Sequence, residues 1–212
     1  MKKLESSLTN MTLVLTGVAV IMGAILAFVN DMTSGPIQEQ KNKALADGIK
    51  TVLVCDDCTV THTDTVCQTD AKGKQLSFVV YHAADKDSHS IGAAVESTTM
   101  GFGGDLKVLV GFSTEGDILG YTLLEHAETP GLGAKADKWF QKGEKGDIIG
   151  KNPGQKPVGV KKDKKESEQQ VDAITASTIT SRAFLLAVNN AYNAYKAMPV
   201  DISTGATKQH KN

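Results

Sequence analysis

The sequence has 212 residues, a formal net charge of -1 and 22% charged residues. This near-neutral balance gives no electrostatic indication of nucleic-acid binding or of an acidic substrate, and we expect no nucleic-acid partner. The chain after residue 30 is long enough for one hydrophobic core, so we expect a single domain there.

The N-terminal part contains an apolar segment long enough to cross a membrane. Residues 11–29 form a run of 19 residues without a charge, which as a helix spans roughly 28 Å, about the thickness of a bilayer core. The run is longer than the apolar region of a secretory signal, and Ala24–Ala27 has the wrong spacing for a cleavage site. We therefore predict an uncleaved transmembrane helix over residues 11–30, with a cleaved signal as the alternative.

The charges that flank this segment indicate its orientation. Lys2 and Lys3 precede it, and no Lys or Arg follows it until Lys41. Because positive residues favour the cytoplasmic side, we expect a single-pass protein of the inner (cytoplasmic) membrane. Its N-terminus would be cytoplasmic and its main domain periplasmic or otherwise extracytoplasmic.

The next part of the chain mixes one helix with strands. Gly35–Pro36 predicts a turn, and the apolar spacing over Ile37–Cys55 predicts a helix. Thr59–Ala71 is polar and indicates a loop or an edge hairpin. Strands are predicted at Gln75–Tyr81 and Ile91–Glu96 from their β-branched and aromatic content.

A glycine-rich stretch, Gly101–Gly104, separates these elements from a second pair of strands. Leu106–Phe112 and Ile118–Glu125 are predicted to form a hairpin. Ala134–Gln141 resembles a short helix, and the Lys- and Gly-rich segment 142–170 is predicted to be a loop. The resulting fold class is α+β, with antiparallel strands and flanking helices.

The three cysteines leave more than one interpretation open. Cys55 and Cys58 have the spacing of a redox pair, but Asp56 and Asp57 between them would raise the thiol pKa values. A local disulfide or two plain thiols is the preferred interpretation, and Cys67 has no assigned role. The histidines at positions 62, 82 and 89 are interpreted as surface residues, and no metal site is predicted.

The densest polar motif is Asp172–Ser181, which holds five hydroxyl side chains. It precedes an amphipathic pattern over Ile179–Met198, which Pro199 ends. The motif therefore lies at the first turn of a helix, where free backbone N–H groups favour an anion. The alternative is that Ser177 or Thr178 is an ordinary N-cap.

Three stretches together resemble one protein family. These stretches are Gly101–Gly104, His126–Gly133 (H-A-E-T-P-G-L-G) and Asp172–Ser181 (D-A-I-T-A-S-T-I-T-S). They are similar to the FMN-binding domain of flavin-carrying electron-transport subunits. With one N-terminal span and this length, the chain most resembles the G subunit of Rnf ion-translocating oxidoreductases, which is related to the C subunit of the sodium-pumping NADH:quinone reductase.

The resemblance implies a covalent cofactor site. In that family FMN is attached through a phosphoester to the last Thr of an S/T-G-A-T motif. Carried over residue by residue, the motif is Thr175–Thr178 and the acceptor is Thr178. Two positions depart from the family: Ala176 stands where Gly is usual, and Ser177, a competing hydroxyl, stands where Ala is usual.

The resemblance also implies the residues around the flavin. Leu132 would pack on the isoalloxazine ring, and Thr129 would reach its polar edge. The phosphodiester would accept hydrogen bonds from helical N–H groups and from hydroxyls. The complete expected set of cofactor-binding residues is Glu128, Thr129, Leu132, Gly133, Thr175, Ser177, Thr180 and Ser181.

The function implied by the resemblance is an electron relay. The complex would oxidise ferredoxin, reduce NAD and move Na⁺ or H⁺, with other membrane subunits as partners and a flavin transferase acting during maturation. No catalytic residue of the chain's own is expected. The expected organisation is a cytoplasmic N-terminus (1–10), a transmembrane helix (11–30), a membrane-proximal helix with the first strands (31–89), an FMN-binding core (90–198) and a polar tail (199–212).

Two other functions fit the residues. One is a membrane-anchored extracytoplasmic binding or assembly module without a cofactor, in which the hydroxyls cap a helix and the cysteines form a structural link. The other is a thiol redox protein that uses Cys55 and Cys58.

Overall fold

The computed structural model describes residues 8–55, 57–69, 75–86, 89–163 and 169–197. The chain divides into two units, residues 1–44 and 45–212. The expectations for the first seven residues and for the tail 199–212 lie outside the described residues, as do Met198 and Pro199.

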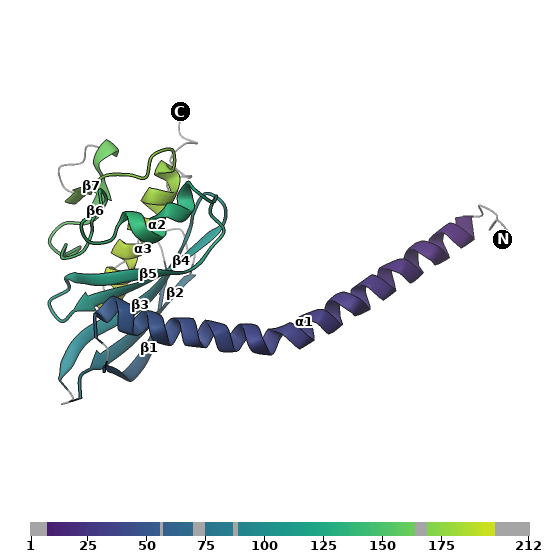
Figure 1. Cartoon of the computed structure of the whole chain (residues 1–212), viewed down its shortest axis with the longest axis horizontal. Coiled ribbons are helices and arrows are strands. Elements are labelled where there is room, and N and C mark those ends of the chain that lie inside the picture. Colours follow the sequence, from purple (N-terminus) through teal and green to yellow (C-terminus); the bar gives the residue numbers. More distant parts are fainter. Residues whose placement is uncertain (1–7, 56, 70–74, 87–88, 164–168, 198–212) are drawn as a thin grey trace. The chain divides into compact units, whose positions relative to one another are not determined.

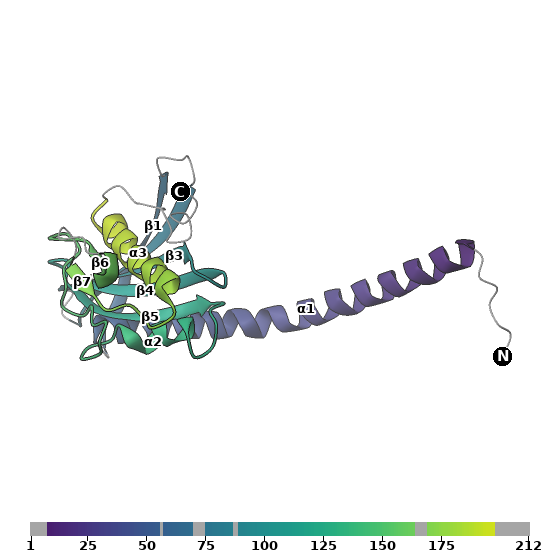
Figure 2. The same ribbon diagram turned by 90° about the horizontal axis from the view of Figure 1, so that it is seen from above.

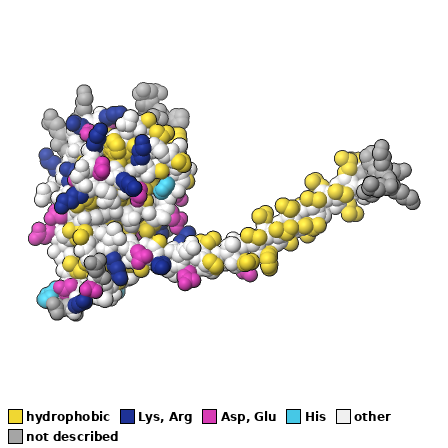
Figure 3. Space-filling model, in the orientation of Figure 1, with side chains coloured by type: hydrophobic (Ala, Val, Ile, Leu, Met, Phe, Trp, Pro, Cys, Tyr) yellow, Lys and Arg dark blue, Asp and Glu magenta, His cyan; other side chains and the backbone are white. Residues whose placement is uncertain are grey.

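One long helix, α1 (Leu8–Leu53), contains the apolar segment and continues past it. Its side chains over residues 11–29 are exposed, and Figure 3 shows hydrophobic side chains along this part. The helix is long and apolar enough to cross a membrane. The predicted turn at Gly35–Pro36 is wrong, because Pro36 lies inside α1. Gly35 has no Cβ, which removes one of the clashes that a proline makes in a helix.

An antiparallel sheet of five strands forms the centre of the second unit (Figure 1). Each strand pairs with the next one along the chain, in the order β1-β2-β3-β4-β5. The four predicted strands all lie within observed strands, and most of the polar segment after residue 58 forms the edge strand. The bounds are β1 Thr59–Thr69, β2 Gln75–Ala84, β3 Ser90–Met100, β4 Asp105–Ser113 and β5 Ile118–His126.

The main hydrophobic core lies between one face of this sheet and helix α3 (Thr178–Tyr195). Figure 2 shows α3 lying across the sheet. Phe184 and Val188 of α3 are fully buried, together with Val95 and Val110 of the sheet. The predicted apolar face of this helix is therefore confirmed as far as Ala191, and the helix starts one residue earlier than predicted.

The last turns of α1 cover part of the other face of the sheet. Ile49, Val52 and Leu53 form a smaller core with sheet residues such as Leu109. Gly111 and Gly120 are paired across β4 and β5, and a Cβ at Gly111 would lie 2.2 Å from the backbone oxygen of Val52. The two glycines thus form a notch that lets the helix backbone approach the sheet.

The segment between β5 and α3 is less regular. A 3₁₀ turn (Gly133–Lys135) leads into the short helix α2 (Ala136–Trp139), so the helix predicted over Ala134–Gln141 is shorter than expected. The Tyr121 hydroxyl donates to the Ala136 oxygen (2.7 Å) and accepts from the Phe140 N–H (3.1 Å). Burial raises the pKa of the Tyr121 phenol above its ordinary value, so it stays neutral and keeps both bonds.

The segment predicted to be a loop contains a two-stranded parallel pair. β6 (Val158–Val160) pairs with β7 (Gln169–Val171), and a 3₁₀ turn, Lys161–Asp163, follows β6. The side chain of Asn189 in α3 accepts from Val158 N–H and donates to Val158 oxygen, each at 2.9 Å. These two bonds replace a neighbouring strand and join β6 to α3.

Candidate functional site

Three segments that are distant in the sequence meet at the side chain of Glu128, directly after β5. This side chain is buried. Its Oε1 accepts a hydrogen bond from Phe102 N–H (2.7 Å) in the β3–β4 turn, and its Oε2 accepts one from the Thr180 hydroxyl (2.7 Å) in α3. One carboxylate therefore joins the glycine-rich turn, the segment after β5 and the start of α3.

Two glycines make room for this carboxylate. A Cβ at Gly101 would lie 2.1 Å from Glu128 Oε1, and one at Gly133 would lie 2.4 Å from Oε2. Both distances are far below van der Waals contact, so any side chain at either position would displace Glu128. The two glycines thus let the backbone approach a carboxylate of the protein.

The start of α3 is fixed by hydrogen bonds within the hydroxyl-rich motif. Ser181 Oγ accepts from Ile174 N–H and donates to the Ser177 oxygen, both at 2.9 Å, and Ser181 is fully buried. Ala176 has a φ of 61°, in the left-handed region that favours glycine. This turn reverses the chain immediately before the helix, so that Ser177 and Thr178 follow it at the N-terminus of α3.

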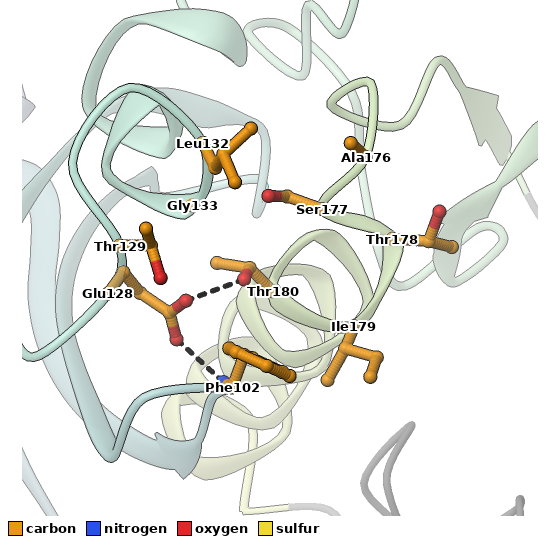
Figure 4. Close-up of a pocket in the computed structure, with 10 residues that line it drawn as sticks. All are labelled: Phe102, Glu128, Thr129, Leu132, Gly133, Ala176, Ser177, Thr178, Ile179 and Thr180. Carbon is orange, nitrogen blue, oxygen red and sulfur yellow. Dashed lines mark hydrogen bonds between the residues drawn. The ribbon is translucent and has the colours of Figure 1, made fainter.

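A cavity of about 340 Å³ lies between these segments. Figure 4 shows the Ser177 side chain pointing toward Leu132, whereas the Thr178 side chain points to the other side of the loop. The cavity has polar and apolar walls from the turn after β3, the segment after β5 and the start of α3. Its lining residues are Phe102, Glu128, Thr129, Leu132, Gly133, Ala176, Ser177, Thr178, Ile179 and Thr180.

The residues expected at the site are mostly brought together by the fold. Thr178 and six of the eight expected cofactor-binding residues line the cavity, whereas Thr175 and Ser181 do not. Thr175 is exposed on the turn before α3, and Ser181 is buried behind it. Phe102, Ala176 and Ile179 line the cavity but are absent from the expected set. The glycines on either side of Phe102, between two strands, marked a hairpin tip that could have indicated it.

The electrostatics of the α3 N-terminus favour an anion. The first intrahelical bond runs from Ser181 N–H to the Ser177 oxygen (3.0 Å), so the N–H groups of residues 178–180 precede the helical ladder. Arg182 lies one turn after Thr178 and is paired with Asp163. That hydrogen bond raises the pKa of the Arg182 guanidinium, which keeps its charge.

Trp139 supports the motif from the α2 side. Its indole N–H donates to the Asp172 oxygen (2.9 Å), and its ring packs against the main core. Trp139 is therefore a packing residue and is not among the residues that line the cavity.

Neither the cysteines nor His62 and His82 are among the residues that line this cavity. Cys55 and Cys58 form a disulfide with a Cα–Cα distance of 5.8 Å, whereas Cys67 is exposed. His62 and His82 both contact Asp64, at 2.7 and 3.2 Å. Within the described ranges, no group of three or more metal-binding side chains has a geometry suited to a metal ion.

Comparison with known proteins gives consistent matches. The model of the FMN-binding domain family matches residues 101–193. The chain is 30% identical over 190 residues to the G subunit of the Na(+)-translocating ferredoxin:NAD(+) oxidoreductase complex of Acetobacterium woodii, covering 87% of this chain and 89% of that protein. It is also 30% identical over 187 residues to the G subunit of the proton-translocating ferredoxin:NAD(+) oxidoreductase complex of Clostridium ljungdahlii, covering 88% and 91%.

A solved structure is also similar. The C subunit of the Na(+)-translocating NADH-quinone reductase from Parabacteroides distasonis matches with a TM-score of 0.44 and 19% identity, covering 65% of this chain and 76% of that one.

Proposed function

The chain belongs to the family of G subunits of Rnf-type ion-translocating oxidoreductase complexes, and we propose that it relays electrons through FMN attached by a phosphoester to Thr178. The relatives' names include both sodium and proton translocation. We therefore propose that the chain is a subunit of an ion-translocating ferredoxin:NAD oxidoreductase complex. The proposal does not choose between sodium and protons as the translocated ion.

The observation that carries this proposal is the position of Thr178. It is the first residue of α3 and lines the cavity together with the segment after β5. A phosphodiester on its hydroxyl would carry one negative charge next to the free N–H groups of the first helical turn. Such a contact contributes only about 0.3–1 kcal/mol when exposed, so a covalent bond would be needed to retain the cofactor.

The residues of the cavity fit the chemistry of FMN. Its volume falls in the range of small-molecule sites. Leu132, Phe102 and Ile179 supply apolar surface for the ring, and Thr129 supplies a hydroxyl for its polar edge. Bound FMN would supply reversible electron transfer.

The expected polar residues divide into direct and indirect roles. Thr180 and Glu128 are bonded to each other, so we assign them to holding the cavity walls. Ser181 positions the N-terminus of α3, and the exposed hydroxyl of Thr175 faces solvent near the attachment site. We propose no acid, base or nucleophile of the chain's own, because the attached group carries the chemistry.

The proposed location follows from the apolar part of α1. We propose that residues 11–30 anchor the chain in the inner membrane as a single pass, with the N-terminus in the cytoplasm and the FMN-binding core outside. The disulfide between Cys55 and Cys58 suits an oxidising compartment. The partners would be the other membrane subunits and, during maturation, a flavin transferase.

The test is covalent flavin content. The full chain would be expressed with a flavin transferase, denatured, washed and examined by in-gel fluorescence and by peptide mass spectrometry. We expect a fluorescent band with FMN on the peptide containing Thr178, and no band for Thr178→Ala. Thr175→Ser is the matched control and should keep the flavin, because Thr175 lies outside the cavity lining and serine retains the hydroxyl at the first position of the motif.

Two outcomes would contradict the proposal. A Thr178→Ala band as bright as the parent would exclude this residue as the acceptor. A colourless parent protein would favour the membrane-anchored binding or assembly module without a cofactor.

A further inference from the structure

Ser177 has the backbone position of a helix cap but not its side-chain bond. It is the N-cap residue of α3, yet its side chain makes no cap hydrogen bond. Its carbonyl oxygen accepts from both the N–H and the hydroxyl of Ser181, at 3.0 and 2.9 Å. The backbone of Ser177 is therefore fixed, while its hydroxyl has no protein partner among the residues that the structure describes.

The Ser177 residue is largely buried, and its hydroxyl is directed into the cavity. Ser177 is 9% exposed, and Figure 4 shows its oxygen pointing toward Leu132. A ligand that fills the cavity would shield this hydroxyl from water, and leaving it unpaired would then be unfavourable. A ligand bound in the cavity would supply the hydrogen-bond acceptor that the protein does not provide.

The other buried polar side chains of the cavity are already engaged. Both oxygens of Glu128 accept hydrogen bonds, and the Thr180 hydroxyl donates its only proton to Glu128. Among the buried residues that line the cavity, Ser177 is thus the one whose hydroxyl no described protein acceptor engages. The free N–H groups at the start of α3 add positive potential beside it, which favours an oxygen atom as the acceptor.

We infer that Ser177 donates a hydrogen bond to an oxygen of the group bound in this cavity, and so acts as a positioning residue for it. The inference rests on the proposed function, in which that group is FMN on Thr178. A carbonyl oxygen of the ring and a phosphodiester oxygen have the same acceptor chemistry. The direction of the side chain, toward Leu132 and away from Thr178, favours the ring.

The test compares the flavin-loaded and flavin-free forms of the full chain in detergent. Ser177→Ala should lower the melting temperature of the loaded form by about 2–4 °C, the shift expected for loss of one hydrogen bond in a chain of this size. It should leave the flavin-free form unchanged, since no protein bond is lost. Ser177→Thr, which keeps the hydroxyl, should restore the loaded form.

Ser181→Ala is the matched control from the same turn. Its hydroxyl makes two protein hydrogen bonds, so this variant should lower the melting temperature of both forms equally. Equal effects of Ser177→Ala on the two forms would identify an ordinary cap and overturn the inference. No effect on either form would also overturn it.

Spectroscopy of the loaded protein identifies the acceptor. With a ring acceptor, Ser177→Ala should raise the frequency of a flavin carbonyl band in the infrared spectrum. With a phosphodiester acceptor, the phosphorus NMR resonance should shift instead. FMN recovered on Ser177 by peptide mass spectrometry would overturn the inference, since the ester would consume the hydroxyl. A parent protein without covalent flavin would instead refute the proposed function before this comparison is made.

Discussion

The Thr180 hydroxyl donates a 2.7 Å hydrogen bond to Oε2 of Glu128, a residue 52 positions earlier in the chain. The other oxygen of the same carboxylate accepts from Phe102 N–H. The three walls of the cavity are therefore held together by one side chain. Glu128 contributes to the shape of the cavity, because protein donors already occupy both of its carboxylate oxygens.

Replacing Glu128 should loosen the cavity. We expect Glu128→Ala to lower the free energy of unfolding by about 2–4 kcal/mol, because it leaves buried donors unpaired and opens a void. Glu128→Gln should cost less, since its amide can accept from Phe102 and its other end can face Thr180. Urea unfolding of the full chain in detergent measures both values. An alanine variant as stable as the parent would show that the carboxylate does not hold these segments together.

Alanine substitutions at two nearby glycines distinguish the effect of steric crowding from that of backbone strain. A Cβ at Gly133 would lie 2.4 Å from Glu128 Oε2, whereas Gly131 has a φ of 75° and open space around it. We expect Gly133→Ala to displace Glu128 and lower both stability and covalent flavin content. Gly131→Ala should cost only the left-handed conformation, about 1 kcal/mol, and should keep the flavin. Thermal unfolding and in-gel fluorescence distinguish the two variants.

Much of the fold could be predicted because its signals are local. The strands show β-branched runs, and α3 shows apolar residues at steps of three and four. The predictions of secondary structure were wrong for two reasons: the context of one residue overrode a local rule, and one strand was too short to show a pattern. Pro36 follows a glycine and stays inside α1, and β7 is only three residues long, too short for a periodic pattern.

The candidate site depended on contacts between distant segments. No periodicity relates Glu128 to Thr180, so their pairing could be anticipated only through resemblance to a family. The resemblance grouped most of residues 128–133 with residues 177–180, and the structure places these residues around one cavity. The resemblance could not indicate that Thr175 and Ser181 lie outside the cavity lining. Their position outside the lining depends on the left-handed turn at Ala176 and on the hydrogen bonds of Ser181, which are features of three-dimensional structure.

The glycine notch at the end of α1 leads to a prediction about packing. A Cβ at Gly111 would lie 2.2 Å from the Val52 oxygen, and the atoms it meets are mainly backbone. We expect Gly111→Ala to lower the free energy of unfolding by about 1–3 kcal/mol, as overpacking does, and to release residues 45–53 from the sheet. Hydrogen exchange of these residues measures the release. Gly23→Ala, within α1 and with open space around it, should leave the exchange unchanged.

The last prediction concerns the strained residue before the attachment site. Ala176 has a φ of 61°, a conformation that costs a residue with a Cβ about 1–2 kcal/mol. Ala176→Gly removes that cost, while the greater freedom of glycine in the unfolded chain offsets roughly 0.5–1 kcal/mol of it. We therefore expect a net gain of about 0.5–1 kcal/mol in the free energy of unfolding, measured by urea titration.

Ala197 provides the matched control, because it follows the other end of α3 with a φ of 54°. Ala197→Gly should stabilise the chain by a similar amount, since glycine is preferred after a helix C-terminus. Only Ala176→Gly should also change the rate at which the transferase attaches FMN, because only this residue determines how Thr178 is presented. Equal attachment rates in the two variants would show that the strain at Ala176 affects folding alone.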